Sequence, residues 1–148
     1  MRAVVQRVTK ADVSVDGQTI GSIAKGLLVF LGIEEEDTEK DVDYIVGKVS
    51  GLRVFDDAQE IPNLSVAEIG GSVLLISQFT LCADVRHGRR PSYIKAARPE
   101  IAVLLYENAI AKLRQVVPVE TGKFQATMQV SLVNDGPHTI LLDSRRTF

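Results

Sequence analysis

The run Gly26-Leu27-Leu28-Val29-Phe30-Leu31-Gly32-Ile33 contains no charged side chain and decides the fold class. A continuous apolar run of this length predicts a β-strand that is buried on both of its faces. Such a strand requires packed layers of secondary structure above and below it. We therefore expect this segment to lie inside a layered domain.

Short strand-like segments dominate the rest of the chain. Strand-like patterns occur in 2–8, 11–15, 18–23, 26–33, 52–55, 72–76, 128–133 and 139–142, and from them we expect about seven strands. Asp16-Gly17 predicts a two-residue hairpin turn between the second and third of these strands. Asn134-Asp135-Gly136-Pro137-His138-Thr139 predicts the turn of a final hairpin, because Asn, Asp, Gly and Pro are turn formers.

Two further segments have helical periodicity. Thr38 is the expected cap of the first helix, and Pro99 begins the second, which Pro118 ends. The first apolar stripe is Val42, Ile45, Val46 and Val49, and the second is Ile101, Leu105, Ala109, Leu113 and Val116. Because runs of strands dominate, we predict a mixed α/β fold: one domain over residues 1–148, with two stacked β-sheets and helices covering one face, in β/β/α layers.

Composition excludes several broad classes. The 148 residues are 45% hydrophobic and 24% charged, as in ordinary globular proteins. No apolar run approaches the length that crosses a bilayer, and the charged segment Met1 to Val8 is too short for a signal peptide. Cys82, the single cysteine, suits a reducing cytosol and is expected to be a free buried thiol. We expect a cytoplasmic protein without a membrane partner.

Positive charge is unevenly distributed along a chain whose net charge is −2. A basic cluster is formed by Arg86, His87, Arg89, Arg90, Lys95 and Arg98, and Arg145-Arg146 stand near the C-terminus. Such a cluster can hold a few phosphates at one end of an RNA. It is also typical of a solvated surface loop, so charge alone leaves both interpretations open.

The usual catalytic and metal-binding motifs are absent. The chain has no G-x-S-x-G nucleophile elbow, no phosphate-binding G-x-x-x-x-G-K and no dinucleotide fingerprint. His87 and His138 are the only histidines, and one cysteine adds no metal cluster. We therefore expect no metal, no cofactor and no standard catalytic triad.

Two polar elements remain as candidate sites. Ser77-Gln78-Phe79-Thr80-Leu81 ends an apolar strand with two hydroxyls and an amide around an aromatic ring. These side chains can face a ligand, or they can cap the local backbone. Gly136-Pro137 is an X-Pro bond, the common place for a cis peptide, which would turn two successive carbonyls to one side. Such carbonyls can grip an ammonium group or sterically refuse a side chain.

The two elements, in this order and at this separation, resemble the D-aminoacyl-tRNA deacylases of the D-Tyr-tRNA deacylase family. The resemblance covers essentially the whole chain. It includes Met1 to Val8 with Arg7, the strand Gly26 to Gly32, Arg90-Pro91-Ser92-Tyr93, and Thr121-Gly122-Lys123-Phe124. Two positions depart from it, because family members often have Gly where Gln125 stands and Val where His138 stands.

The resemblance implies a homodimer that hydrolyses the ester between a D-amino acid, or glycine, and the 3′ end of tRNA, with no DNA partner. The carbonyls of Gly136 and Pro137 from the partner subunit would reject an L side chain, and Arg7 would orient that loop. The residues implied to line the pocket for the ester and terminal adenosine are Ser77, Gln78, Phe79, Thr80 and Met128. The N–H of Phe79 or Thr80 is the candidate oxyanion donor.

Two mechanisms and two other functions stay open. Thr80 can be a direct nucleophile only with an activating base, whereas in the resembling family the 2′-hydroxyl of the tRNA is thought to assist hydrolysis. A related editing deacylase with another amino-acid preference is a second function, and His138 keeps it open. A non-catalytic RNA-binding module is a third, supported by the basic cluster.

Overall fold

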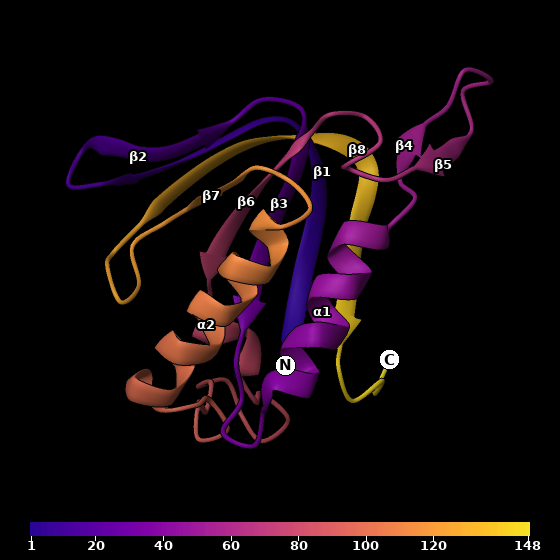
Figure 1. Cartoon of the computed structure of the whole chain (residues 1–148). Coiled ribbons are helices and arrows are strands. Elements are labelled where there is room, and N and C mark those ends of the chain that lie inside the picture. The colour runs from indigo at the N-terminus through magenta and orange to yellow at the C-terminus, as the bar shows by residue number, and fades with distance from the viewer.

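A long first strand organises the computed structural model, which describes all residues from 1 to 148 (Figure 1). The elements are β1 (Arg2–Val15), β2 (Gln18–Ile23), β3 (Gly26–Gly32), α1 (Glu39–Gly51), β4 (Phe55–Asp56), β5 (Pro62–Leu64), β6 (Ser72–Ser77), the 3₁₀ helix η1 (Phe79–Cys82), α2 (Pro99–Arg114), β7 (Val119–Thr121) and β8 (Gln129–Asp143). Asp16 and Gly17 make the predicted turn between β1 and β2, with φ angles of 50° and 76°.

β1 is one strand where the sequence predicted two. Residues Arg2 to Val8 pair with β3, and Ala11 to Val15 pair with β2 on the same edge. β8 pairs with the other edge along nearly the whole strand. The six-stranded sheet has the order β2-β1-β3-β6-β7, with β8 added on β1, and the β3–β6 and β6–β7 pairs are parallel. β4 and β5 form a separate two-stranded sheet.

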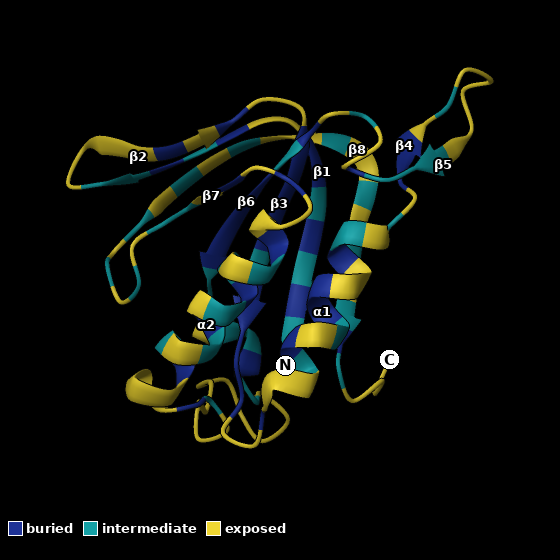
Figure 2. Ribbon diagram, viewed as in Figure 1, coloured by how far each residue is buried: buried dark blue, intermediate teal, exposed yellow.

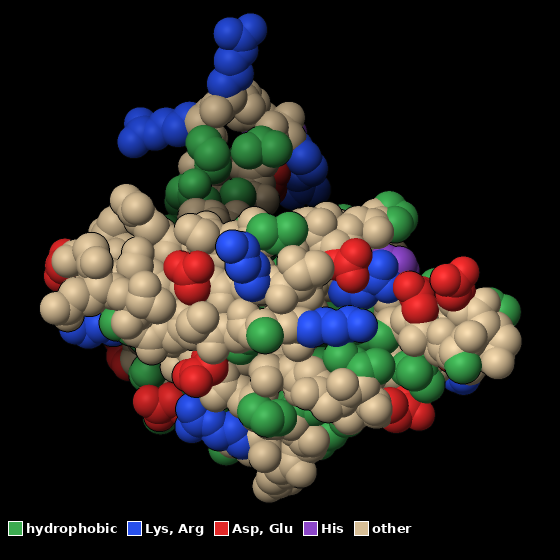
Figure 3. All heavy atoms as spheres, turned by 90° about the horizontal axis from the view of Figure 1, so that it is seen from above, with side chains coloured by type: hydrophobic (Ala, Val, Ile, Leu, Met, Phe, Trp, Pro, Cys, Tyr) green, Lys and Arg blue, Asp and Glu red, His purple; other side chains and the backbone are tan.

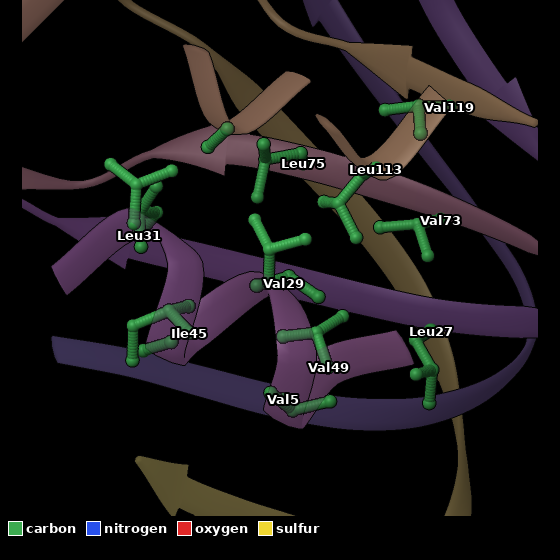
Figure 4. Close-up of a cluster of buried hydrophobic side chains, with 14 of the residues drawn as sticks. Val5, Leu27, Val29, Leu31, Ile45, Val49, Val73, Leu75, Leu113 and Val119 are labelled. Atoms are coloured by element: carbon green, nitrogen blue, oxygen red, sulfur yellow. The ribbon is translucent and has the colours of Figure 1, made fainter. Parts of the chain in front are cut away.

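The two faces of β3 and β6 bury two different hydrophobic clusters. Both helices cover one face, as Figure 1 shows, and the larger cluster lies beneath them. Figure 4 labels ten of its side chains: Val5, Leu27, Val29, Leu31, Ile45, Val49, Val73, Leu75, Leu113 and Val119. The smaller cluster lies on the opposite face and contains Val8, Ala11, Val13, Ile23, Leu28, Leu74 and Ile76. Because this cluster joins β3 and β6 to β2 and the second half of β1, a second strand layer covers that face.

The predicted mixed α/β fold with helices over one face is confirmed. The two strand layers are joined, however, because β1 and β8 run through both of them. The register shifts of the β1–β8 pair, between Gln6 and Lys10, lie where β1 leaves β3 and continues toward β2. Shifts of this kind bend a strand and increase its twist, which lets one strand serve two layers.

The segment around Gly136-Pro137 is not the hairpin turn that the sequence predicted. Both halves of β8 pair antiparallel with β1: Asn134 lies opposite Val8, and Thr139 lies opposite Gln6. Arg7, the one β1 residue between these two pairs, therefore faces the four β8 residues 135–138. These four residues leave the regular strand pairing and form a bulge. The hairpin prediction was wrong because β1 continues past this point and pairs with both flanks. The Gly136-Pro137 peptide bond is cis.

The helices begin where the sequence predicted. Thr38 precedes α1, where its N–H and hydroxyl donate to the Asp41 carboxylate at 2.8 and 3.1 Å. The buried face of α2 differs from the predicted stripe, because Ile101 and Val116 are exposed. Its buried residues are Ala102, Tyr106, Ala109 and Leu113. The prediction passed over Tyr106, a residue with a polar group, whose hydroxyl donates to the carbonyl of a β6 residue at 2.8 Å.

Both helices expose their outer faces and bury only the side that rests on the sheet (Figure 2). Neither has the length and apolar character that a bilayer-crossing helix needs.

Replacing Leu31 with Ala should lower the free energy of unfolding by about 2–5 kcal/mol, because a core Leu→Ala change loses burial and leaves a cavity. Leu31 is 1% exposed within the larger cluster. Urea unfolding monitored by circular dichroism measures the change. Ile61, between β4 and β5, is 57% exposed. Its replacement by Ala is the control and should cost less than about 0.5 kcal/mol. Equal losses would contradict this assignment of the core.

Candidate active site

A pocket of about 570 Å³ opens where β6 ends and η1 begins. Four of the residues that the sequence singled out line it: Ser77, Gln78, Phe79 and Met128. Further lining residues come from the loop before α2, from the start of α2 and from the approach to β8, among them Tyr93, Ala97, Pro99, Phe124 and Gln125. Most lining side chains are hydrophobic, and none is a histidine, a carboxylate, a lysine or an arginine.

The parallel pairing of β3 with β6 positions the polar end of β6. Ser77 lies opposite Leu31, and the Gln78 N–H donates to the Leu31 carbonyl at 2.8 Å. The chain then turns across the end of β3 at Gly32. A Cβ atom on Gly32 would lie 2.8 Å from the Leu81 Cβ and 3.0 Å from the Gln78 carbonyl oxygen. The absence of a side chain at this position therefore lets η1 pack on the strand end.

Thr80 has no base beside it in this arrangement. The Gln78 side-chain amide donates to the Thr80 hydroxyl oxygen. No histidine or carboxylate lines the pocket, and Thr80 itself is not among the lining residues. A threonine hydroxyl needs a base to become a nucleophile. The hydroxyl therefore lacks the usual means of activation.

Backbone N–H groups at the start of η1 are available to a ligand. The first N–H groups of a helical turn have no partner within that turn. The backbone hydrogen bonds of turns and loops include one from Leu81 N–H to the Gln78 carbonyl, but none from the N–H of Phe79 or Thr80. No side chain accepts from these two groups either. Two adjacent free donors can stabilise a negatively charged oxygen.

Aromatic rings stand on two sides of the pocket. Phe79 and Tyr93 form an edge-to-face pair with centroids 5.1 Å apart, and they are 56% and 39% exposed. Phe124 packs against Tyr106 at 5.9 Å. Burial raises the pKa of Tyr106 to about 12, so its hydroxyl stays protonated and donates to the Leu75 carbonyl. This hydrogen bond ties α2 to β6 behind the pocket.

The predicted free and buried state of Cys82 is confirmed. Its thiol lies 3.5 Å from the Ile33 carbonyl. Burial, with a smaller effect from the nearby charge of Glu34, raises the pKa of the thiol to about 11. The thiolate is the reactive form of cysteine. The thiol is therefore unreactive at neutral pH.

Arg7 lies beneath the Gly136-Pro137 bulge and away from the pocket. Its Nε donates to the Asp135 carbonyl at 3.1 Å and lies 3.1 Å from the carboxylate of the same residue. One terminal nitrogen donates to the Val54 carbonyl at 2.7 Å and lies 3.6 Å from the Asp56 carboxylate. Arg7 is 7% exposed, so this buried guanidinium joins the bulge to the chain segment before β4.

Within one chain the bulge does not reach the pocket. Val130 near the start of β8 lines the pocket, but none of residues 135–138 does. Along the strands, Val8 lies opposite both Asn134 and Gly26, and Gly26 lies opposite Ser72 at the start of β6. The pocket lies at the other end of β6, about 16 Å further along. Of the residues singled out by sequence, Arg7, Gly136 and Pro137 thus form a second cluster.

The sequence did not predict the pocket residues that lie far from Ser77 along the chain, namely Tyr93, Phe124 and Gln125. Tyr93 and Phe124 stood within family-like motifs, but neither was assigned to the site. Gln125 was noted only as a departure from the family. Its φ is 64°, in the left-handed region that favours glycine, and it lines the pocket. That conformation fits the Gly that family members often have at this position, and this departure is the sequence signal by which the position could have been recognised.

The fold is shared with solved structures of other proteins. A solved structure described as a probable eukaryotic D-amino acid tRNA deacylase has a TM-score of 0.79, with coverage of 95% of this chain and 98% of that chain. Its sequence identity is 15%, so this similarity shows the fold alone. A solved structure described as c-Myc DNA Unwinding Element Binding Protein has a TM-score of 0.92 and 41% identity, with coverage of 97% and 98%.

The sequence comparisons define the family. The family model described as D-Tyr-tRNA(Tyr) deacylase matches residues 4–143. Proteins named D-aminoacyl-tRNA deacylase from Syntrophobacter fumaroxidans, Koribacter versatilis and Kosmotoga olearia are 56%, 54% and 53% identical, with all of both chains covered in each case. The chain belongs to the D-Tyr-tRNA(Tyr) deacylase family, and the resemblance found in the sequence is confirmed.

Replacing Gly32 with Ala should displace η1 and lower kcat/KM for D-Tyr-tRNA by about 100-fold, because small misplacements of reacting groups have effects of this size. The rate of ester hydrolysis is measured on variant protein whose circular dichroism matches the wild type. Gly47 on α1 is the matched control, since a Cβ there meets nothing within 4 Å. Gly47→Ala should keep the wild-type rate. A Gly32→Ala variant with the wild-type rate would show that the site does not need this close approach.

Proposed function

We propose that this protein hydrolyses the ester bond of D-aminoacyl-tRNA and of Gly-tRNA, releasing the free amino acid and tRNA, and that it rejects L-aminoacyl-tRNA. Its family membership makes the chain a D-aminoacyl-tRNA deacylase, a carboxylic ester hydrolase. The pocket at the end of β6 carries the more detailed proposal, because it combines free backbone donors with an apolar chamber that has no side-chain base. Residues 1–148 act as one deacylase domain in the cytoplasm.

Free backbone donors suit the hydrolysis of an activated ester. Water adds to the ester carbonyl carbon, and the negative charge that develops on the carbonyl oxygen accepts hydrogen bonds from the N–H of Phe79 or Thr80. Loss of one such donor typically slows a reaction about 100- to 1,000-fold. The bond to the 3′ oxygen then breaks, and this oxygen leaves with a proton. The neighbouring 2′-hydroxyl of the tRNA assists, so Thr80 need not act as a nucleophile.

The pocket suits the terminal adenosine in size and character. A volume of about 570 Å³ lies within the usual range of about 300–1,000 Å³ for small-molecule sites. Met128 and Phe124 provide apolar walls for a flat base. Ser77 and Gln78 provide the polar groups beside the ester. No cofactor or metal ion takes part in this proposal.

The separation of bulge and pocket supports a homodimer in which each subunit completes the other's site. Because a two-fold axis places the same surface on both subunits, each bulge can enter the partner's pocket. The outer edge of β8 has no neighbouring strand, and Val133 and Leu141 on this strand are 45% and 58% exposed. An unpaired strand edge with exposed apolar side chains is a natural surface for a second copy.

Selection by the bulge is a matter of shape. The carbonyls of Gly136 and Pro137 would face the α-carbon of the substrate and collide with an L side chain, whereas a D side chain points elsewhere. Specificity then rests on a repulsive contact with the unwanted substrate. The buried hydrogen bonds and ion pairs of Arg7 hold the bulge to the body and support this orientation.

D-Tyr-tRNA and Gly-tRNA should be hydrolysed while L-Tyr-tRNA is spared, because only the L side chain meets the carbonyls of the bulge. Release of amino acid from the three tRNAs under identical conditions measures this preference. Equal hydrolysis of D- and L-Tyr-tRNA would contradict the selection by shape. A different preference among D-amino acids would favour the related editing enzyme that His138 keeps open. If the protein binds these tRNAs but hydrolyses none of them, the result would favour the non-catalytic RNA-binding module.

Thr80→Ala should keep the rate within about tenfold of the wild type, because the hydroxyl makes no covalent bond in the proposed reaction. A substrate whose terminal nucleotide lacks the 2′-hydroxyl should not be hydrolysed by either protein. Single-turnover rates with saturating protein separate chemistry from binding. An inactive Thr80→Ala variant that still binds D-Tyr-tRNA would favour Thr80 as the nucleophile.

A further inference from the structure

The loop between η1 and α2 projects from the body as a short arm. Asp84 and Ser92 close its base with two backbone hydrogen bonds, 2.8 and 3.0 Å long. All seven residues between them, 85–91, are exposed. Gly88 at the tip has a φ of 102°, which allows the chain to reverse there. We call residues 85–91 the basic arm.

The positive charges of this region are mostly unpaired. Arg86 is the exception, since it forms an ion pair with Asp84 and lowers the pKa of that carboxyl. Arg89, Arg90 and Lys95 have no ion pair, whereas the arginines Arg2, Arg7 and Arg145 elsewhere in the chain do. Exposed cations that form no ion pair remain available to an external anion.

The basic arm stands at the mouth of the pocket. Tyr93, one residue beyond its closing bridge, lines the pocket and touches the ring of Phe79. Lys95 follows, and its carbonyl accepts from the Glu35 N–H at 3.0 Å, which fixes the loop to the body. In the view from above, Lys and Arg side chains gather on a lobe that projects from the body, while both signs of charge are mixed elsewhere (Figure 3).

We infer that the basic arm is the docking surface for the single-stranded 3′ end of the tRNA, upstream of the terminal nucleotide. Arg89 and Arg90 of the arm, with Lys95 just beyond it, bind the phosphate groups that precede this nucleotide. The half-exposed ring of Tyr93, beside the arm, offers a stacking surface for an unpaired base. Basic side chains beside exposed aromatic rings are the usual composition of a surface for single-stranded nucleic acid. This inference rests on the proposed function, which places the terminal adenosine in the adjacent pocket.

The double substitution Arg89→Ala and Arg90→Ala should raise KM for D-Tyr-tRNA and lower kcat/KM by about 10- to 100-fold, because two phosphate contacts are lost. The slope of log kcat/KM against log salt concentration should become shallower by about 1.4, because each phosphate contact to a single strand adds about 0.7 to that slope. Lys48→Ala is the control, since Lys48 is exposed on the last turn of α1. This variant should match the wild type in both measurements.

D-tyrosyl adenosine, which has no phosphate, separates this inference from the proposed function. The ratio of kcat/KM for D-Tyr-tRNA to that for D-tyrosyl adenosine should fall in the double variant by the same 10- to 100-fold. If the double variant keeps the wild-type ratio and salt slope, the inference about the basic arm is wrong, whereas the proposed deacylase function is unaffected. If the wild type hydrolyses neither substrate, the proposed function itself fails. A double variant that becomes monomeric in size-exclusion chromatography would show that the arm is a subunit contact.

Discussion

Hydrogen bonding along both edges of β1 is the constraint on which the rest of the structure depends. On one edge, β1 pairs first with β3 and then with β2, and on the other it pairs with β8 throughout. Because one bent strand serves two layers, the helices can cover one face of β3 and β6 while strands cover the other. The same pairing leaves four residues of β8 without partners and forces them out as a bulge.

The proposed chemistry depends on the backbone more than on side chains. No histidine, carboxylate or lysine lines the pocket, and the candidate donors are the N–H groups of Phe79, which lines it, and of the next residue, Thr80. Their positions follow from the register of β6 on β3 and from the close approach at Gly32. The positions of such backbone donors therefore depend directly on how the strands are paired. The buried hydroxyl of Tyr106, held to the Leu75 carbonyl, adds support from the helix layer.

The fold divides the functional surface among three places. The pocket lies at the end of β6, the bulge held by Arg7 lies on β8 beside β1, and the basic arm borders the pocket. A second copy of the chain supplies the bulge in the proposed reaction, and the basic arm supplies the tRNA contact. In the proposed reaction the ester is approached by backbone donors, by carbonyls that exclude one chirality and by cations that hold the nucleic acid.

Local sequence signals predicted much of the secondary structure and part of the site. The apolar run Gly26 to Ile33 predicted a strand buried on both faces, and β3 is such a strand. Thr38 and Pro99 marked the starts of both helices correctly. Ser77 to Phe79 were found because polar groups that end an apolar strand are conspicuous in the sequence. Each of these features depends on residues that are close together along the chain.

Tertiary structure decided what those signals left open. The residues around Gly136-Pro137 have the composition of a turn, and only their pairing with a continuous β1 makes them a bulge. Tyr93, Phe124 and Gln125 line the same pocket as Ser77 although they lie far from it along the chain. No local sequence pattern predicts that these residues share a pocket. The sequence by itself thus determined the strand at Gly26 to Ile33, the helix starts and the family. Pairing and packing over long separations decided where the two motifs lie, because hydrogen bonds between strands join residues without regard to their distance in sequence.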